Sequence, residues 1–190
     1  MCRDAAAKAA KETGVPYEVL VAITTVETGR NDQPWPWTVN FGGDGRWYES
    51  AAEAAKGVDL ALREGATNID LGCFQLNYRW HASAFGSLDD MLDPEQNASY
   101  AAEYLSQHYA KTGDWALAAA AYHSGTPEFA EAYKSKFEAT YDRLAAGADP
   151  VAEPVVDRQN RFPLLVAGSP GLKGSLFPSG TGGHPLIGDP

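Results

Sequence analysis

The chain has 190 residues, of which 44% are apolar, and its 25 acidic and 15 basic residues give a formal net charge of −10. This length and composition suit one domain with its own core. The acidic balance argues against nucleic acid as a partner, because binding a phosphate backbone requires a basic face. No stretch is long and apolar enough to span a bilayer, so we expect no membrane span. We also expect the protein to be a monomer.

The first 149 residues predict a mainly α fold with a small β-hairpin. Apolar spacing and end signals indicate helices over about 4–13, 16–29, 50–65, 93–113, 114–122 and 126–147. Ser50 and Glu53, for example, have the spacing of a capping box. Extended, aromatic-rich sequence on both sides of the glycine-rich turn 42–45 predicts the hairpin within 33–50. We expect residues 69–77 to be irregular or briefly extended.

Residues 150–190 have a different composition. They are rich in proline and glycine, and their apolar residues follow no period. Such a segment cannot bury enough apolar surface to form a second core, so we expect an extended or disordered tail. Its apolar clusters at 162–165 and 176–178 predict docking, either on the domain or on a partner protein. The expected units are therefore a domain at 1–149 and a tail at 150–190.

The two cysteines, Cys2 and Cys73, allow two interpretations. They are buried free thiols, or they form a disulfide if the protein is exported to an oxidising compartment, where such bonds persist. We predict the disulfide in the mature exported protein, with the secretion signal lying outside this sequence. The cysteines and the four histidines lack the spacing of a zinc site, so we expect no metal and no cofactor.

Glu27 is the residue that stands out on chemical grounds. It continues the apolar stripe of Leu20 and Ile23, so its carboxyl group occupies a position that faces the core. It also lies in the last turn of its helix, where the helix dipole disfavours a further negative charge. Both effects favour the protonated form, which a general acid for glycoside cleavage requires. The alternative is a buried glutamate that pairs with Arg30 or caps a loop.

Three short motifs occur in order along the chain. The first is a helix-terminal glutamate followed by a hydroxyl residue, in Val26-Glu27-Thr28-Gly29-Arg30. The second is Gly72-Cys73-Phe74-Gln75-Leu76-Asn77, and the third is Ala121-Tyr122-His123-Ser124-Gly125. In this order and spacing, the segment from about residue 5 to residue 144 resembles the soluble lytic transglycosylases. That family shares a lysozyme-like helical fold with the goose-type lysozymes.

The resemblance implies a reaction on the glycan strands of peptidoglycan, in the periplasm or outside the cell. Glu27 would protonate the glycosidic oxygen between N-acetylmuramic acid and N-acetylglucosamine. It would then act as a base toward the muramoyl C6 hydroxyl, giving a 1,6-anhydromuramoyl end. Similar enzymes with a domain and a tail occur with flagella in alphaproteobacteria. By that analogy we expect local wall opening for a flagellum or secretion apparatus, with the tail binding proteins of the apparatus.

The resemblance also implies a set of substrate-binding residues. Gln75 would hydrogen-bond the sugar, and the ring of Phe74 would line the cleft beside it. Tyr122 would lie near the catalytic glutamate, with its hydroxyl toward the carboxylate or the sugar. His123 stands where the family has asparagine, which changes the chemistry of that position. Tyr133 matches the tyrosine of a fourth motif, although the usual acidic residue is not at the matching position.

Two other functions remain open from the sequence. Ordinary glycosidases place a second carboxylate across the scissile bond, so a hydrolytic muramidase would use Asp70 or Asp44. The other alternative is a non-catalytic, glycan-binding scaffold on the same fold. Aromatic residues around the hairpin are either sugar-stacking platforms or hairpin core: Trp35, Trp37, Trp47 and Tyr48.

Overall fold

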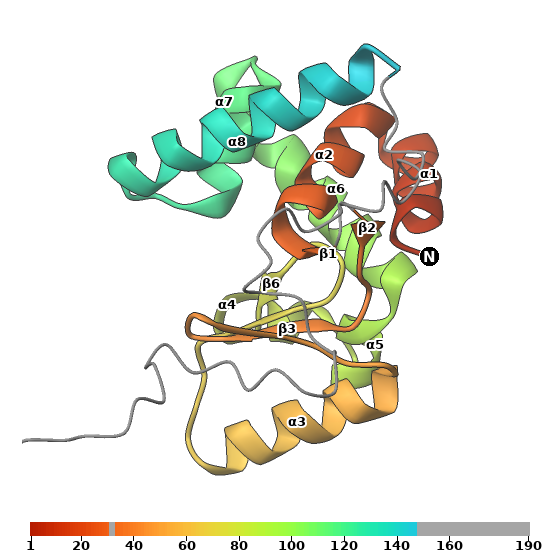
Figure 1. Ribbon diagram of the computed structural model, residues 1–190. Coiled ribbons are helices and arrows are strands. Elements are labelled where there is room, and N and C mark those ends of the chain that lie inside the picture. Colours follow the sequence, from red (N-terminus) through yellow and green to blue (C-terminus); the bar gives the residue numbers. More distant parts are fainter. Residues whose placement is uncertain (31–32, 148–190) are drawn as a thin grey trace, which may run out of the picture. The chain divides into compact units, whose positions relative to one another are not determined.

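The computed structural model describes residues 1–30 and 33–147. It is mainly helical with small antiparallel sheets, as the sequence predicts (Figure 1). The longer helices are α1 (Cys2–Thr13), α2 (Tyr17–Thr28), α3 (Ala51–Arg63), α6 (Pro94–Thr112), α7 (Trp115–His123) and α8 (Pro127–Ala145). The strands are β1 (Gly29–Arg30), β2 (Gln33–Pro34), β3 (Thr38–Phe41), β4 (Asp44–Trp47), β5 (Ile69–Leu71) and β6 (Leu76–Asn77). The predicted tail at 150–190 lies outside the described residues.

The helix ends follow the local signals in the sequence. At the start of α3, the Ser50 hydroxyl accepts a hydrogen bond from the Glu53 amide at 3.2 Å, and the Glu53 carboxylate accepts one from the Glu49 amide. At the start of α6, the Asp93 carboxylate accepts from the amides of the next turn. That helix ends at Gly113, whose φ of 68° lies in the left-handed region. These caps explain why most predicted boundaries are close to the observed ones.

Five helices pack into a bundle that contains most of the core. Helix α1 packs on α6, α6 on α7 and α7 on α8, while α2 packs between α1 and α8. Figure 1 shows α7 and α8 running side by side. The central turn of α7 is Ala118, Ala119 and Ala120, all buried. These small side chains allow its neighbours to approach closely, because the distance between packed helices depends on the side chains at the contact.

The antiparallel sheet places a row of polar side chains on one face. Its strand order is β4-β3-β5-β6, with Asn40 opposite Asp70 and Asp70 opposite Asn77. Successive side chains of a strand point to opposite faces, and residues directly opposite each other share a face. The neighbouring Val39 and Leu71 are fully buried, so they occupy the core face. The row of Asn40, Asp70 and Asn77 therefore faces away from this core.

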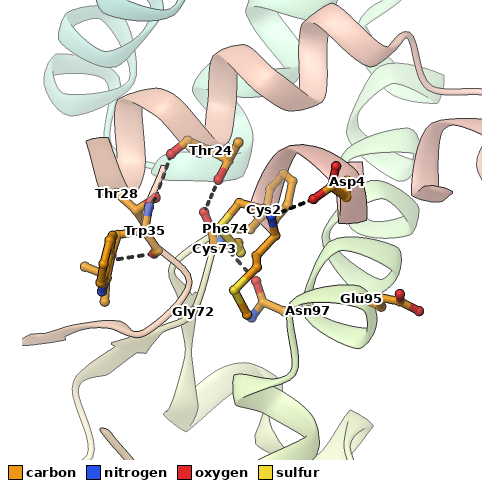
Figure 2. Close-up of a disulfide and its surroundings, with 12 residues drawn as sticks. Cys2, Asp4, Thr24, Thr28, Trp35, Gly72, Cys73, Phe74, Glu95 and Asn97 are labelled. Atoms are coloured by element: carbon orange, nitrogen blue, oxygen red, sulfur yellow. Dashed lines mark hydrogen bonds and ion pairs between the residues drawn. A yellow bond between two sulfur atoms is a disulfide. The ribbon is translucent and has the colours of Figure 1, made fainter. Parts of the chain in front are cut away.

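The turn between β5 and β6 is fixed from three sides (Figure 2). A disulfide joins Cys73 to Cys2 of α1, with 5.6 Å between the two Cα atoms. The Thr24 hydroxyl of α2 donates to the Cys73 carbonyl at 2.6 Å. From α6, the Asn97 side-chain oxygen accepts from the Phe74 amide at 2.9 Å. The segment that carries the second motif is therefore tied to the helical bundle.

Several short elements were not predicted. They are helices α4 (Tyr78–His81) and α5 (Leu88–Leu92), the 3-10 turn η1 (Ala82–Ala84), and the β1–β2 pair. Each is shorter than two helical turns or a normal strand, so no apolar period develops in the sequence. Among the described residues, no helix combines the length and the apolar character needed to cross a membrane.

Candidate active site

A polar cleft of about 630 Å³ lies where the end of α2, the sheet and the end of α7 meet. Most of the groups along it are amides, carboxylates, imidazoles and aromatic rings. The residues that line it are Glu27, Asn40, Asn68, Asp70, Gln75, Leu76, Asn77, Trp80, His81, Tyr104, Ala121, Tyr122, His123, Ser124 and Gly125. The three sequence motifs, which are far apart in the chain, thus contribute residues to one cleft.

Glu27 lies in the last turn of α2, and its side chain is only 13% exposed. One neighbour is His123, whose Nδ1 lies 3.7 Å from Glu27 Oε1, and another is the buried hydroxyl of Tyr133. The alternative pairing with Arg30 does not occur. Arg30 instead lies over the ring of Trp35 and within 3.4 Å of the Glu49 carboxylate. The Glu27 carboxyl group therefore remains available at the wall of the cleft.

The ring of Tyr133 supports His123 from the opposite side. The two rings are stacked with centroids 4.2 Å apart and an interplanar angle of 10°. Tyr133 is buried, and its hydroxyl interacts with the Glu27 carboxylate. Burial, followed by the nearby negative charge of Glu27, raises the pKa of Tyr133 well above its usual range. Tyr133 thus contributes a neutral hydroxyl beside Glu27.

Two expectations about the aromatic residues of the motifs need correction. Phe74 is fully buried, so its ring belongs to the core and does not line the cleft. Tyr122 does line the cleft, but its hydroxyl donates to the Phe74 carbonyl at 2.7 Å and not to a carboxylate. Burial, and then the charge of Glu27, raises the pKa of this hydroxyl well above its usual range. Both residues therefore stabilise the turn that carries Gln75.

Gln75 lines the cleft and is held in an unusual conformation. Its φ of 47° lies in the left-handed region, which non-glycine residues seldom adopt. Its Nε2 donates to the carbonyls of Thr38 at 3.0 Å and Gly72 at 2.9 Å. Both donor hydrogens of the amide are thus engaged with backbone. The amide oxygen is the group left to face a ligand.

Gly72 explains how this turn can lie so close to α6. Its φ of 78° is in the left-handed region, and a Cβ there would lie 2.6 Å from Asn97 Nδ2. Asn97 is fully buried and also bonds the carbonyls of Leu71 and Met91. Only glycine leaves room for this buried amide, which in turn determines where Gln75 lies.

The two candidate second carboxylates lie in different places. Asp70 lines the cleft with Glu27, and it accepts a hydrogen bond from Asn77 Nδ2 at 2.8 Å. Burial is the main cause of its raised pKa, to which the negative charge of Glu27 also contributes. Asp44 is exposed, pairs with Arg46 at 2.7 Å and does not line the cleft. Of the two, only Asp70 has a position that allows a role beside Glu27.

Trp80, an exposed aromatic residue on the rim of the cleft, was not predicted from the sequence. Trp80 in α4 lines the cleft and is 69% exposed. The hairpin aromatics considered as stacking platforms do not line it: Trp35, Trp37, Trp47 and Tyr48. The signal for Trp80 was weak, because α4 is too short to show which face of the helix is apolar. No group of three or more metal-ligating side chains is found in the described part of the chain.

Comparison with protein-family models identifies the class to which this fold and cleft belong. The model described as "Transglycosylase SLT domain" matches residues 4–144, which is most of the chain. The chain therefore belongs to the transglycosylase SLT family, whose lysozyme-like domain is characteristic of lytic transglycosylases acting on peptidoglycan. No curated protein and no solved structure gives a significant match.

Proposed function

We propose that this protein is a periplasmic or secreted lytic transglycosylase of peptidoglycan. It cleaves the β-1,4 bond between N-acetylmuramic acid and N-acetylglucosamine and leaves a 1,6-anhydromuramoyl end. The observation that carries the proposal is the position of Glu27. Its largely buried carboxyl group stands at the wall of a polar cleft, in a chain of the transglycosylase SLT family.

In the proposed reaction Glu27 acts twice. The carboxyl proton passes to the glycosidic oxygen as the bond from that oxygen to the muramoyl C1 breaks. The resulting carboxylate then takes the proton of the muramoyl C6 hydroxyl, whose oxygen forms a new bond to C1. The acid is regenerated and no water is consumed. The imidazole of His123, 3.7 Å from the carboxylate, would keep Glu27 oriented through both steps.

The other residues of the cleft suit the binding of a sugar. The Gln75 amide oxygen and the side-chain nitrogen of Asn40 are hydrogen-bonding groups that hydroxyl and N-acetyl groups require. The exposed indole of Trp80 offers a flat apolar surface for the apolar face of a sugar ring. Tyr133 and His123 would contact the sugar nearest to Glu27. These roles are assigned from position in the cleft.

A second candidate function is a hydrolytic muramidase, and the position of Asp70 favours it. Asp70 and Glu27 line the same cleft, and the negative charge of Glu27 contributes to the raised pKa of Asp70. A second carboxylate of this kind activates water or forms a covalent intermediate in ordinary glycosidases. In that reaction water would take the place of the C6 hydroxyl, and the product would have a reducing end.

Mass spectrometry of the released muropeptides distinguishes these functions. The wild-type protein is incubated with purified cell walls, and the digest is compared with that of the Asp70→Asn variant. The proposal predicts products that are one water lighter than the hydrolysed ones, from both proteins. Reducing ends from the wild type, lost in Asp70→Asn, would establish the muramidase. If the wild type releases no muropeptide, the non-catalytic scaffold is the remaining function.

A further part of the proposal concerns the segment at 150–190. We propose that it is a second unit that recruits the enzyme to a flagellum or secretion apparatus, on the grounds of its composition and its apolar clusters alone. Catalysis should not need it, because every proposed site residue lies before residue 149. Deleting residues 151–190 should leave the release of muropeptides from purified walls largely unchanged. A truncated protein that stays folded but no longer cleaves would contradict this part of the proposal.

A further inference from the structure

A second, smaller pocket adjoins the cleft at Glu27. Its volume is about 230 Å³, and Glu27 and His123 line both the pocket and the cleft. The remaining walls come from the end of α2 and from α8, and include Phe129, Tyr133 and Lys136. A substituent on a sugar held beside Glu27 can therefore enter this pocket without leaving the protein surface. The proposed reaction assigns no ligand to it.

The pocket combines an apolar wall with a cation. Phe129 is 62% exposed although it is a large apolar residue. Lys136 is exposed, and no carboxylate among the described residues lies within ion-pairing distance of it. Lys134, two residues away, differs because it pairs with carboxylates before and after it on the same helix. Lys136 is thus a cation that remains available to a ligand.

The Tyr133 hydroxyl adds a buried polar group to the same pocket. It is shielded from solvent and interacts with the Glu27 carboxylate, so it connects this pocket to the proposed acid. The pocket therefore suits a ligand that has an apolar part and a negative charge.

We propose that this pocket binds the carboxylate-bearing arm of the muramoyl residue, which is the lactyl group on O3 and the beginning of any peptide stem attached to it. This inference rests on the proposed function. The lactyl methyl group would contact Phe129, and a carboxylate of the arm would pair with Lys136. The volume holds about eight water-sized atoms, which is close to the size of a lactyl group with one small amino acid.

The charge of the protein makes this assignment selective. The chain has a formal net charge of −10, and the cleft itself contains Glu27 and Asp70. An anionic arm is repelled by such surroundings, unless a cation lies where the arm is placed. Lys136 is the lysine that the pocket offers at that position. N-acetylglucosamine has no lactyl arm, so the pocket would distinguish the two sugars of the strand.

Binding to an inactive variant tests the inference. Titration calorimetry with Glu27→Gln compares three ligands of equal sugar length. Two are muramoyl oligosaccharides, one with a free lactyl carboxylate and one with a peptide stem, and the third is a chitin oligosaccharide without the arm. Adding Lys136→Met should weaken binding of a muramoyl ligand by about five-fold at low salt, and Phe129→Ala should weaken it as well. Neither change should affect the chitin ligand.

The exposed Lys56 of α3 supplies a matched control, because Lys56→Met removes the same charge away from the pocket. It should leave all three affinities unchanged. A loss in Lys136→Met with the free-lactyl ligand supports pairing with the lactyl carboxylate, which a peptide stem converts into an amide. A loss with the stem-bearing ligand supports pairing with a carboxylate of the stem. Equal affinities before and after Lys136→Met, or an equal loss for chitin, would overturn the inference. Cleavage of walls by the wild type would still stand in that case, so the two proposals fail separately.

Discussion

Replacing Asn97 by alanine should destabilise the protein strongly. This fully buried side chain donates to the carbonyls of Leu71 at 3.1 Å and Met91 at 2.9 Å, and it accepts from the Phe74 amide at 2.9 Å. Alanine removes these three buried hydrogen bonds at once, and the Phe74 amide loses the partner that fixes the turn. At about 1–3 kcal/mol for each group, and with some relief from water that enters the vacated space, the free energy of unfolding should fall by roughly 3–6 kcal/mol.

Urea unfolding followed by circular dichroism measures this loss, and the melting temperature should fall by about 10 °C or more. Gln96→Ala is the matched control, because the neighbouring Gln96 is exposed and its side-chain amide donates to Asp90 at the surface. The control should lose less than about 0.5 kcal/mol. If Asn97→Ala lost no more than this control, the buried amide would not hold the turn that carries Gln75, and the reasoning would be refuted.

Three further predictions concern stability. Reducing the Cys2–Cys73 bond, which spans 71 residues, should lower the free energy of unfolding by about 4 kcal/mol; mass change on alkylation before and after reduction checks that the exported protein contains the bond, and free thiols would contradict it. Asp70→Asn should raise the melting temperature at neutral pH, because burial raises the folded-state pKa of Asp70 and the ionised carboxylate destabilises the fold. This gain should vanish as the pH falls below the unfolded-state pKa of 3.8, where the carboxyl group is protonated in both states. Burial, and then the charge of Lys111, lowers the pKa of His108, so the folded state favours the neutral imidazole. The neutral imidazole stabilises the fold above the unfolded-state pKa of 6.5, and this stabilisation is lost as the pH falls through the folded-state pKa. The melting temperatures of the wild type and His108→Gln are compared between about pH 5 and pH 8. A difference that stays the same over this range would contradict the prediction.

The parts of the fold that could be predicted from the sequence are those determined by nearby residues. A cap such as Ser50 with Glu53, or a glycine after a helix such as Gly113, signals its boundary within a few positions. The hairpin followed from a glycine-rich turn between two extended segments. Glu27 was predicted to face inward from the apolar period of its own helix, and its side chain is largely buried.

The parts that could not be predicted depend on contacts between distant segments. The direction of the Phe74 ring follows from the left-handed turn at Gly72 and from the bond between the Phe74 amide and Asn97, 23 residues further along the chain. The polar row that brings Asp70 into the cleft depends on the register of β3 with β5, which joins residues about 30 positions apart. Local sequence patterns contain neither contact. The exposed Trp80 was missed because its short helix shows no period.

In the proposed reaction Glu27 supplies the proton that cleaves the glycan strand. The most direct test is the rate at which Glu27→Gln releases 1,6-anhydromuropeptides from purified cell walls, measured beside the wild type. Glutamine keeps the size of the side chain, so the melting temperature should remain nearly unchanged. Because the general acid is lost, we expect the rate to fall by roughly 10²-fold or more. A folded Glu27→Gln protein that kept more than about a tenth of the wild-type rate would contradict it.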